Sequence, residues 1–333
     1  MRKHKYLETC QARFQNYGST YKSIMLGSTV INTCEPQNIQ AILATQFTDF
    51  QLGARRNTAF EPLLGHGIFA SDGETWSGAR RVLKPAFSKD NTDYHNMLGK
   101  HVSNLFEAID GHQRTSADGA VDIQKLFFRL TLDVASEMFF GASTVSLRAE
   151  PDDVSCNAFA EAFEVTQRWI AKRFVLGPFS FLQPNGGFNE ARKVLSDQLD
   201  LHVDRVLQMM KKQDSHNNEA GQSSPAVRNS QNGDVSQKQC YVVLEELARH
   251  TSDPTSLEHH LLNLLVAARD TTASLLSNMW HVLAQRPDIW EKLEAEVLTV
   301  RSAPEPMNLA SLKGMPYLQA CIKECRLLQL LGS

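Results

Sequence analysis

The sequence lacks the features that define several protein classes. Its six cysteines form no C-x-x-C pair, and their spacing fits neither a zinc site nor a disulfide framework. A reduced, intracellular environment is therefore expected. No run of about 18 apolar residues occurs, and the amino-terminal residues lack the apolar core of a signal peptide. We therefore expect a chain that is cytoplasmic or peripherally attached to a membrane.

Neither sign of charge dominates. The 34 Lys and Arg residues face 37 Asp and Glu residues, for a net charge of −3. This balance gives no electrostatic footprint for nucleic acid, so no nucleic-acid partner is expected. Apolar residues make up 42% of the chain and charged residues 21%, values typical of a globular protein with a real core. The 333 residues suffice for one large domain or two modest ones.

Hydrophobic periodicity predicts a mainly α fold with a small β element near the amino terminus. Residues 21–36 carry β-branched residues around a Gly-Ser pair, which predicts a hairpin. The spacing of Ile39, Ile42 and Leu43 then predicts a short amphipathic helix. The remaining expected helices cover approximately residues 74–88, 92–112, 121–141, 154–171, 188–212, 242–250, 256–286 and 287–301.

A change of composition marks residues 214–239. This segment is rich in Ser, Asn, Gln and Gly and has almost no apolar side chain to bury. We expect a flexible surface loop that separates two helices and lies inside one domain.

One expected helix contains the sequence LLNLLVAARDTTASLLSNMWHVLA, in which polar residues interrupt an apolar run. Ala267 and Ala268 are small enough to let a flat or bulky ligand approach the helix backbone. The Thr271 hydroxyl can bond the carbonyl four residues earlier, and Asp270 beside a hydroxyl can relay protons. The alternative interpretation is that Arg269 and Asp270 face solvent and that the threonines only bond their own helix.

A second candidate stretch is HGIFASDGETWSGARRVLKPAFS. Trp76 and Arg80 are four residues apart and therefore share one face of a helix, which Asp72 or a neighbour is expected to cap. An indole N–H and a guanidinium on the same face suit a carboxylate or a propionate. The alternative is a partly buried Trp beside a solvated Arg.

Together and in this order, the two stretches resemble the cytochrome P450 family of haem-thiolate monooxygenases. WSGAR matches the family's W-x-x-x-R, and AARDTT matches its A/G-G-x-D/E-T-T/S, with Ala268 in place of the usual glycine. LAQRPDIWEKLEAEV and LKGMPYLQACIKE resemble the segments that follow. The resemblance covers residues 6 to 325 and is strongest to fungal members that hydroxylate alkanes and fatty acids.

This resemblance implies a cytochrome P450-like helical fold, haem b as cofactor and oxidation of an apolar substrate (a fatty acid, an alkane or a secondary metabolite). It also implies electrons from NADPH through the flavins of NADPH-cytochrome P450 reductase, and a family location at the endoplasmic-reticulum membrane. It assigns roles to six residues: Trp76 and Arg80 at a haem propionate, Ala267 and Ala268 at the cofactor's oxygen groove, and Asp270 and Thr271 in proton delivery to dioxygen.

The sequence also departs from the family pattern. The family's E-x-x-R places Glu and Arg one turn apart, but Arg326 follows Glu324 after two positions, so the two side chains do not face each other. The axial-cysteine motif F-x-x-G-x-R-x-C-x-G is absent, so no metal ligand is assigned. We also expect the chain to lack the amino-terminal anchor of eukaryotic members. Residues 1–333 are therefore expected to form a partial cytochrome P450 domain that lacks the C-terminal haem-ligand region.

Three functions remain open at this point. The first is a haem-dependent monooxygenase, with candidate pocket residues Phe60, Leu63, Leu64 and Ile68 placed just before WSGAR. The second is a truncated, catalytically inactive remnant without the cysteine iron ligand, whose exposed apolar surface invites aggregation or proteolysis. The third is a helical interaction protein, which leaves the two ordered motifs unexplained.

Overall fold

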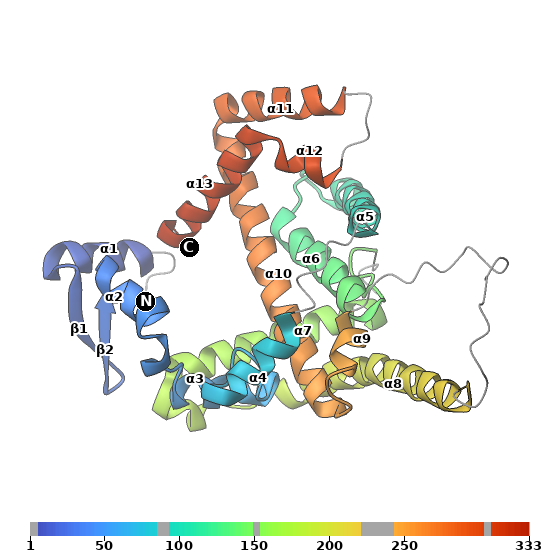
Figure 1. Cartoon of the computed structure of the whole chain (residues 1–333). Coiled ribbons are helices and arrows are strands. Elements are labelled where there is room, and N and C mark those ends of the chain that lie inside the picture. The colour runs from blue at the N-terminus through green and yellow to red at the C-terminus, as the bar shows by residue number, and fades with distance from the viewer. Residues whose placement is uncertain (1–5, 85–92, 149–153, 221–242, 303–307, 333) are drawn as a thin grey trace.

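The computed structural model describes residues 6–84, 93–148, 154–220, 243–302 and 308–332. These residues form a helical body with one two-stranded sheet, as predicted (Figure 1). The α-helices are α1 (Tyr6–Tyr17), α2 (Pro36–Gln40), α3 (Ala54–Leu64), α4 (Gly73–Leu83), α5 (Asp93–Thr115), α6 (Ile123–Phe140), α7 (Val154–Leu176), α8 (Phe188–Ala220), α9 (Val243–Ala248), α10 (Pro254–Gln285), α11 (Pro287–Arg301), α12 (Leu309–Lys313) and α13 (Pro316–Gly332).

Helix α10 runs through the centre of the molecule (Figure 1). Its contacts are most extensive with α6, and it also packs on α3, α8, α9, α11 and α13. The Asp253 carboxylate caps its first turn by accepting from the backbone N–H groups of Thr255 and Ser256. Because α10 is packed on many sides, its side chains are held at fixed positions. This includes the polar residues 269–272 in its middle.

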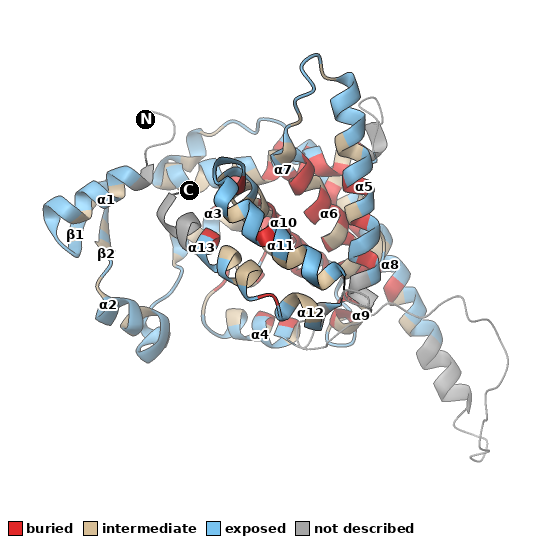
Figure 2. Ribbon diagram, turned by 90° about the horizontal axis from the view of Figure 1, so that it is seen from above, coloured by how far each residue is buried: buried red, intermediate tan, exposed pale blue. Residues whose placement is uncertain are grey.

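The main core lies where α10 crosses α6 and α7, in the region of dense burial in Figure 2. Leu132 from α6, Phe163 from α7, Leu199 from α8 and Leu261 from α10 are fully buried there. Burying such a side chain contributes about 1.5–3 kcal/mol. The apolar half of α10 that precedes its polar group is therefore the helix's anchor in the core.

The hairpin consists of antiparallel β1 (Thr20–Met25) and β2 (Ser28–Thr33) and lies at the edge of the molecule (Figure 1). The prediction of a Gly-Ser turn is wrong by one residue. Leu26 and Gly27 form the turn, with φ of 48° and 79°, and Ser28 already pairs with Met25. Two successive residues with positive φ are the requirement of the turn whose twist matches the strands.

The helix expected after the hairpin is present but irregular. α2 passes into a π-helical turn, η1 (Ala41–Thr45), and a 3₁₀ turn, η2 (Phe47–Asp49). None of its residues is buried, and Leu43 is 69% exposed. Its apolar face therefore does not enter the core, contrary to the usual consequence of an amphipathic pattern. Ile42 and Leu43 line a cavity instead.

Two predicted boundaries are wrong. The loop expected over 214–239 begins too early, because α8 continues to Ala220; its remainder, 221–239, lies outside the described residues. Each residue added to an existing helix gains one hydrogen bond, so a polar composition does not by itself end it. The helix expected over 74–88 ends at Leu83, and residues 85–88 lie outside the described part. Helix α3, which contains Pro62, was not predicted.

Candidate functional site

Trp76 and Arg80 lie one turn apart on α4, as predicted from their spacing. The guanidinium carbon of Arg80 lies 5.5 Å from the centroid of the Trp76 indole, a cation–π contact. The indole is half-buried and also contacts Phe47, with ring centroids 5.3 Å apart. Because Arg80 remains exposed, its donors are available to a ligand while the indole holds the side chain in place.

Asp72 occupies the N-cap position of α4, but the prediction that its side chain caps this helix is wrong. Its carboxylate accepts from the backbone N–H groups of Leu52 (2.7 Å) and Gly53 (3.0 Å) and from Nδ2 of Asn57 (2.8 Å). Burial acts to raise the pKa of Asp72, but these three hydrogen bonds outweigh it and lower the pKa. Asp72 thus ties the start of α3 to the start of α4.

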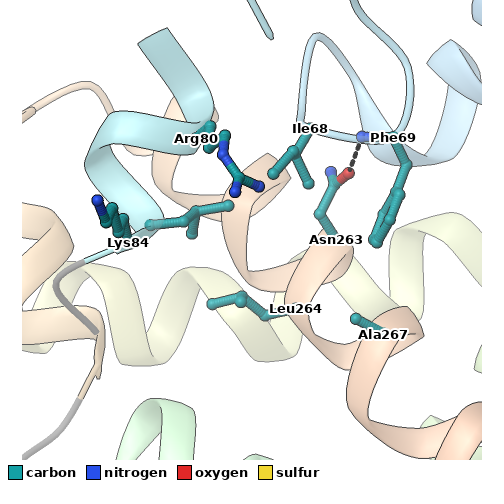
Figure 3. Close-up of a pocket in the computed structure, with 8 residues that line it drawn as sticks. Ile68, Phe69, Arg80, Lys84, Asn263, Leu264 and Ala267 are labelled. Carbon is teal, nitrogen blue, oxygen red and sulfur yellow. Dashed lines mark hydrogen bonds between the residues drawn. The ribbon is translucent and has the colours of Figure 1, made fainter. Parts of the chain in front are cut away.

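Two cavities lie beside these helices. The inner one has a volume of about 300 Å³ and is bounded by α4, the segment between α3 and α4, and α10 (Figure 3). Its lining is Ile68, Phe69, Arg80, Leu83, Lys84, Asn263, Leu264 and Ala267. The outer one, about 800 Å³, lies among η1, η2, α3 and α4 and includes Trp76. Both volumes are in the range of ligand-binding pockets.

The two cavities share a wall. Ile68, Phe69 and Arg80 line both of them. Apart from Arg80, Lys84 and Asn263, every described residue that lines the inner cavity is apolar. The arrangement suits a ligand with an apolar body and an anionic end, because a carboxylate accepts charge-assisted hydrogen bonds from Arg and Lys.

Of the predicted groove residues on α10, Ala267 lines the inner cavity. Ala268 is partly buried and packs against the main core. The Thr271 hydroxyl is exposed and donates to the Ala267 carbonyl across 2.7 Å, the predicted bond to the preceding turn. This bond orients the hydroxyl and leaves its oxygen free to accept a hydrogen bond.

The interpretation that Arg269 faces solvent is wrong, and Asp270, whose side chain is 39% exposed, does not simply face solvent because both of its carboxylate oxygens are hydrogen-bonded. Arg269 is 3% exposed, and its guanidinium donates to Asp270 Oδ1 (3.2 Å), Gln167 Oε1 (3.2 Å) and Glu164 Oε1 (3.0 Å). Gln167 Nε2 in turn donates to Asp270 Oδ2 across 2.8 Å. Asp270 is therefore held toward α7. Periodicity could not reveal Glu164 and Gln167, which lie on α7, more than 100 residues away in the sequence.

The candidate pocket residues are only partly right. Ile68 lines both cavities, as expected. Leu63 and Leu64 are fully buried in the main core, so their assignment to a pocket is wrong. Phe60 packs edge-to-face on Phe174 and lines neither cavity. The last turn of α3 belongs to the core, whereas Arg56 near its start and the segment that follows it reach the cavities.

The residues present fit part of a haem. Arg80 and Lys84 supply cations for its carboxylates, and the small Ala267 leaves space beside α10. No cysteine is among the described residues that line either cavity. Burial raises the pKa of the Cys321 and Cys325 thiols on α13, which disfavours the thiolate. In the described part of the chain, no group of three or more His, Cys, Asp or Glu side chains is placed to hold a metal.

Two further expectations concern α13 and the membrane. Glu324 and Arg326 are both exposed on α13, consistent with residues two apart that point in different directions.

No helix within the described ranges has the length and apolar character needed to cross a bilayer.

Comparison with known proteins gives one consistent family. A sequence model described as Cytochrome P450 matches residues 1–329. Cytochrome P450 52A4 from Candida maltosa is 36% identical over 313 residues, which is 90% of this chain and 53% of the relative. Cytochrome P450 monooxygenase himC from Aspergillus japonicus is 36% identical over 325 residues, 97% of this chain and 54% of the relative. The chain thus spans about half the length of the curated relatives it matches.

A solved structure shares the fold. The crystal structure of a cytochrome P450, CYP102L1, superposes with a TM-score of 0.71 at 18% sequence identity, covering 98% of this chain and 70% of that one. At this identity the likeness shows the fold alone. It confirms the predicted helical architecture.

Proposed function

Because the chain belongs to the cytochrome P450 family, we propose that it is a haem-dependent monooxygenase that oxidises an apolar substrate. One observation supports this proposal most directly. Arg80 from WSGAR and Ala267 from AARDTT, although far apart in the sequence, line the same cavity. The two motifs therefore meet in space, as they must if both serve one cofactor.

In this proposal the cofactor is haem b, which when bound supplies the oxidative chemistry. Arg80 and Lys84 hold its carboxylates, and the Trp76 indole keeps the Arg80 guanidinium in place through the cation–π contact. Ala267 would leave room for the flat macrocycle against α10, and Ala268, which packs against the main core, is proposed as the second small residue of the groove. A larger side chain at position 267 would enter the cavity directly.

Asp270 and Thr271 are proposed to move protons to dioxygen. Thr271 Oγ1 is oriented by its bond to the Ala267 carbonyl and can accept a hydrogen bond from a donor in the groove. Both carboxylate oxygens of Asp270 are occupied, Oδ1 by Arg269 and Oδ2 by Gln167. To take up and pass on a proton, Asp270 exchanges its bond to Gln167 for one to water or to Thr271.

The substrate is proposed to be a fatty acid, an alkane or an apolar secondary metabolite that occupies the outer cavity. The side chains of Leu43, Phe47, Phe50 and Leu52 line that cavity and are between 43% and 69% exposed. Covering these exposed apolar side chains with a hydrocarbon removes apolar surface from water, which is favourable. Electrons are proposed to come from NADPH through NADPH-cytochrome P450 reductase.

An inactive remnant is the second candidate, and one observation favours it: none of the described residues that line the two cavities is a cysteine. Without a thiolate on the iron, haem lacks the electron donation on which cleavage of the O–O bond depends in this family. This candidate predicts a folded or partly folded chain that does not form the thiolate-haem spectrum.

A haem titration separates the two candidates. The purified chain is titrated with haem and followed by its Soret absorption, then reduced under carbon monoxide to test for the band that gives the family its name. On the monooxygenase proposal, Arg80→Ala lowers haem affinity about tenfold or more, because one charge-assisted contact is lost. Arg81→Ala, an exposed neighbour that lines neither cavity, should leave it unchanged. A chain that binds no haem supports the remnant instead.

A further inference from the structure

Asn263 stands where α10 faces the wall shared by the two cavities (Figure 3). Its side chain is fully buried. Oδ1 accepts from the backbone N–H of Phe69 across 3.1 Å, and Nδ2 donates to the carbonyls of Leu64 (2.9 Å) and His259 (2.7 Å). One amide thus joins both ends of the segment 64–69 to α10.

Side chains outside α10 also form hydrogen bonds with the segment 64–69. Arg56 Nε donates to the Phe69 carbonyl across 3.1 Å, and Ser71 Oγ donates to the Gly67 carbonyl across 2.7 Å. The backbone of Phe69 is therefore bonded at its N–H by α10 and at its carbonyl by α3. These hydrogen bonds restrict the backbone conformation of Ile68 and Phe69.

Two glycines let the segment approach α10 this closely. A Cβ at Gly67 would lie 2.0 Å from Asn263 Nδ2, and a Cβ at Gly65 would lie 2.1 Å from Nδ1 of His259. Gly65 also has a φ of +54°, a conformation that favours glycine. The segment 64–69 therefore lies in close contact with α10. The position of the Asn263 side chain sets the position of Ile68 and Phe69, which form the shared wall.

We propose that Asn263 is a positioning residue that sets the length of apolar ligand the cavities accept, by fixing Ile68 and Phe69. The inference rests on the proposed function only in that the ligand is apolar. It differs from a purely structural role, in which Asn263 satisfies buried backbone groups and affects stability alone. A structural role would weaken binding of all ligands alike, whereas a positioning role changes which length binds best.

The probe is a series of 1-bromoalkanes from hexyl to tetradecyl, whose bromine quenches tryptophan fluorescence on contact. Trp76 lines the outer cavity and is the reporter; Trp76→Phe gives the blank for the other tryptophans. Each additional buried methylene should raise affinity roughly three- to fourfold, until the chain meets the wall. The length at which this increase stops measures the cavity.

In Asn263→Leu, which has a similar size but makes none of the three bonds, the increase should stop at a length different by two carbons or more. Thr166→Val is the matched control, because Thr166 is fully buried but bonds only carbonyls of its own helix. It should keep the wild-type length profile. A wild-type profile in a folded Asn263→Leu protein overturns the inference, as does a wild-type protein that binds no bromoalkane.

Hydrogen exchange of the unmodified protein covers the case in which Asn263→Leu does not fold. The Phe69 amide should exchange as slowly as the buried amides of α10, and exchange at the rate of an unprotected amide overturns the inference. The outcomes are separate from those of the haem titration. Loss of haem binding with a shifted length profile removes only the proposed function, and haem binding with an unchanged profile removes only this inference.

Discussion

Gln167 Nε2 lies 2.8 Å from Asp270 Oδ2 and holds the central carboxylate of α10 toward α7. The bond is one side of a network in which the Arg269 guanidinium reaches Gln167, Asp270 and Glu164. A group proposed to carry protons is thus held in a rest position by neutral and cationic donors. Proton transfer by the Asp270 carboxylate therefore requires that its hydrogen bonds to Gln167 or Arg269 break.

Asp270→Asn tests the proposed proton transfer. The amide keeps the size of the side chain but cannot be protonated at this position under ordinary conditions, so oxidation of substrate should fall about 100-fold or more. Haem affinity should stay unchanged in Asp270→Asn, whereas Arg80→Ala is expected to lower it. Product formation with a reductase and NADPH, beside a haem titration, measures both. Wild-type turnover in Asp270→Asn would rule out the role, and Asp288→Asn, an exposed carboxylate on α11, serves as control.

Arg269→Met should destabilise the chain by about 2–3 kcal/mol. The buried guanidinium bonds two carboxylates and lies 4.7 Å from the Phe128 ring centroid and 5.3 Å from that of Phe163. Glu164→Gln should cost under about 1 kcal/mol, because the Glu164 side chain is half exposed and its charge is screened by water. Urea unfolding measures the two free energies, and equal losses would contradict the buried network.

Asp133→Asn should lower the free energy of unfolding by about 2–4 kcal/mol. The Asp133 carboxylate is fully buried in α6 and accepts from the side chain of Thr144, from N–H and hydroxyl of Ser146 and from the N–H of Leu147, at 2.6–3.0 Å. An amide presents one N–H₂ to donors and loses the charge that strengthens these bonds. Asp110→Asn, an exposed carboxylate on α5, is the control and should change the urea midpoint little.

Stability should fall as the pH drops below about 6.5. Burial lowers the pKa of His202, His259 and His260 below their ordinary value of 6.5. Between 6.5 and each lowered pKa the unfolded chain therefore binds more protons than the folded one, so acid favours unfolding. The loss is complete once the pH is below the folded pKa values. Urea midpoints at pH 7.5 and at about pH 5.5 measure the effect.

His202→Phe provides the matched comparison for this pH effect. The substitution keeps a ring against Phe140, whose centroid lies 5.2 Å from that of His202, but removes one titrating group. The slope of stability against pH should become shallower in this variant. An unchanged slope would show that His202 does not contribute.

Much of the architecture could be predicted from local patterns. Helix α11 begins at Pro287 and ends at Arg301, as predicted, because proline favours a first helical position. Helix α6 ends at Phe140, and its end likewise follows from the next residue, Gly141, which tolerates the left-handed conformation (φ of 74°). The misplaced start of the loop after α8 and the unpredicted α3 show the limit of composition, which does not report how far a helix extends once it has formed.

Within the site, residue spacing alone was enough to predict which groups share a helix face: Trp76 with Arg80, and Thr271 with the Ala267 carbonyl. These relationships depend only on the helical repeat. Three other relationships depend on how the helices pack: Arg269 is buried against α7, Asp72 bonds Gly53 and Asn57 at the start of α3, and Asn263 holds the segment 64–69. Such contacts join residues far apart in the chain, and they exist only where the packing of helices brings a donor within about 3 Å of its acceptor.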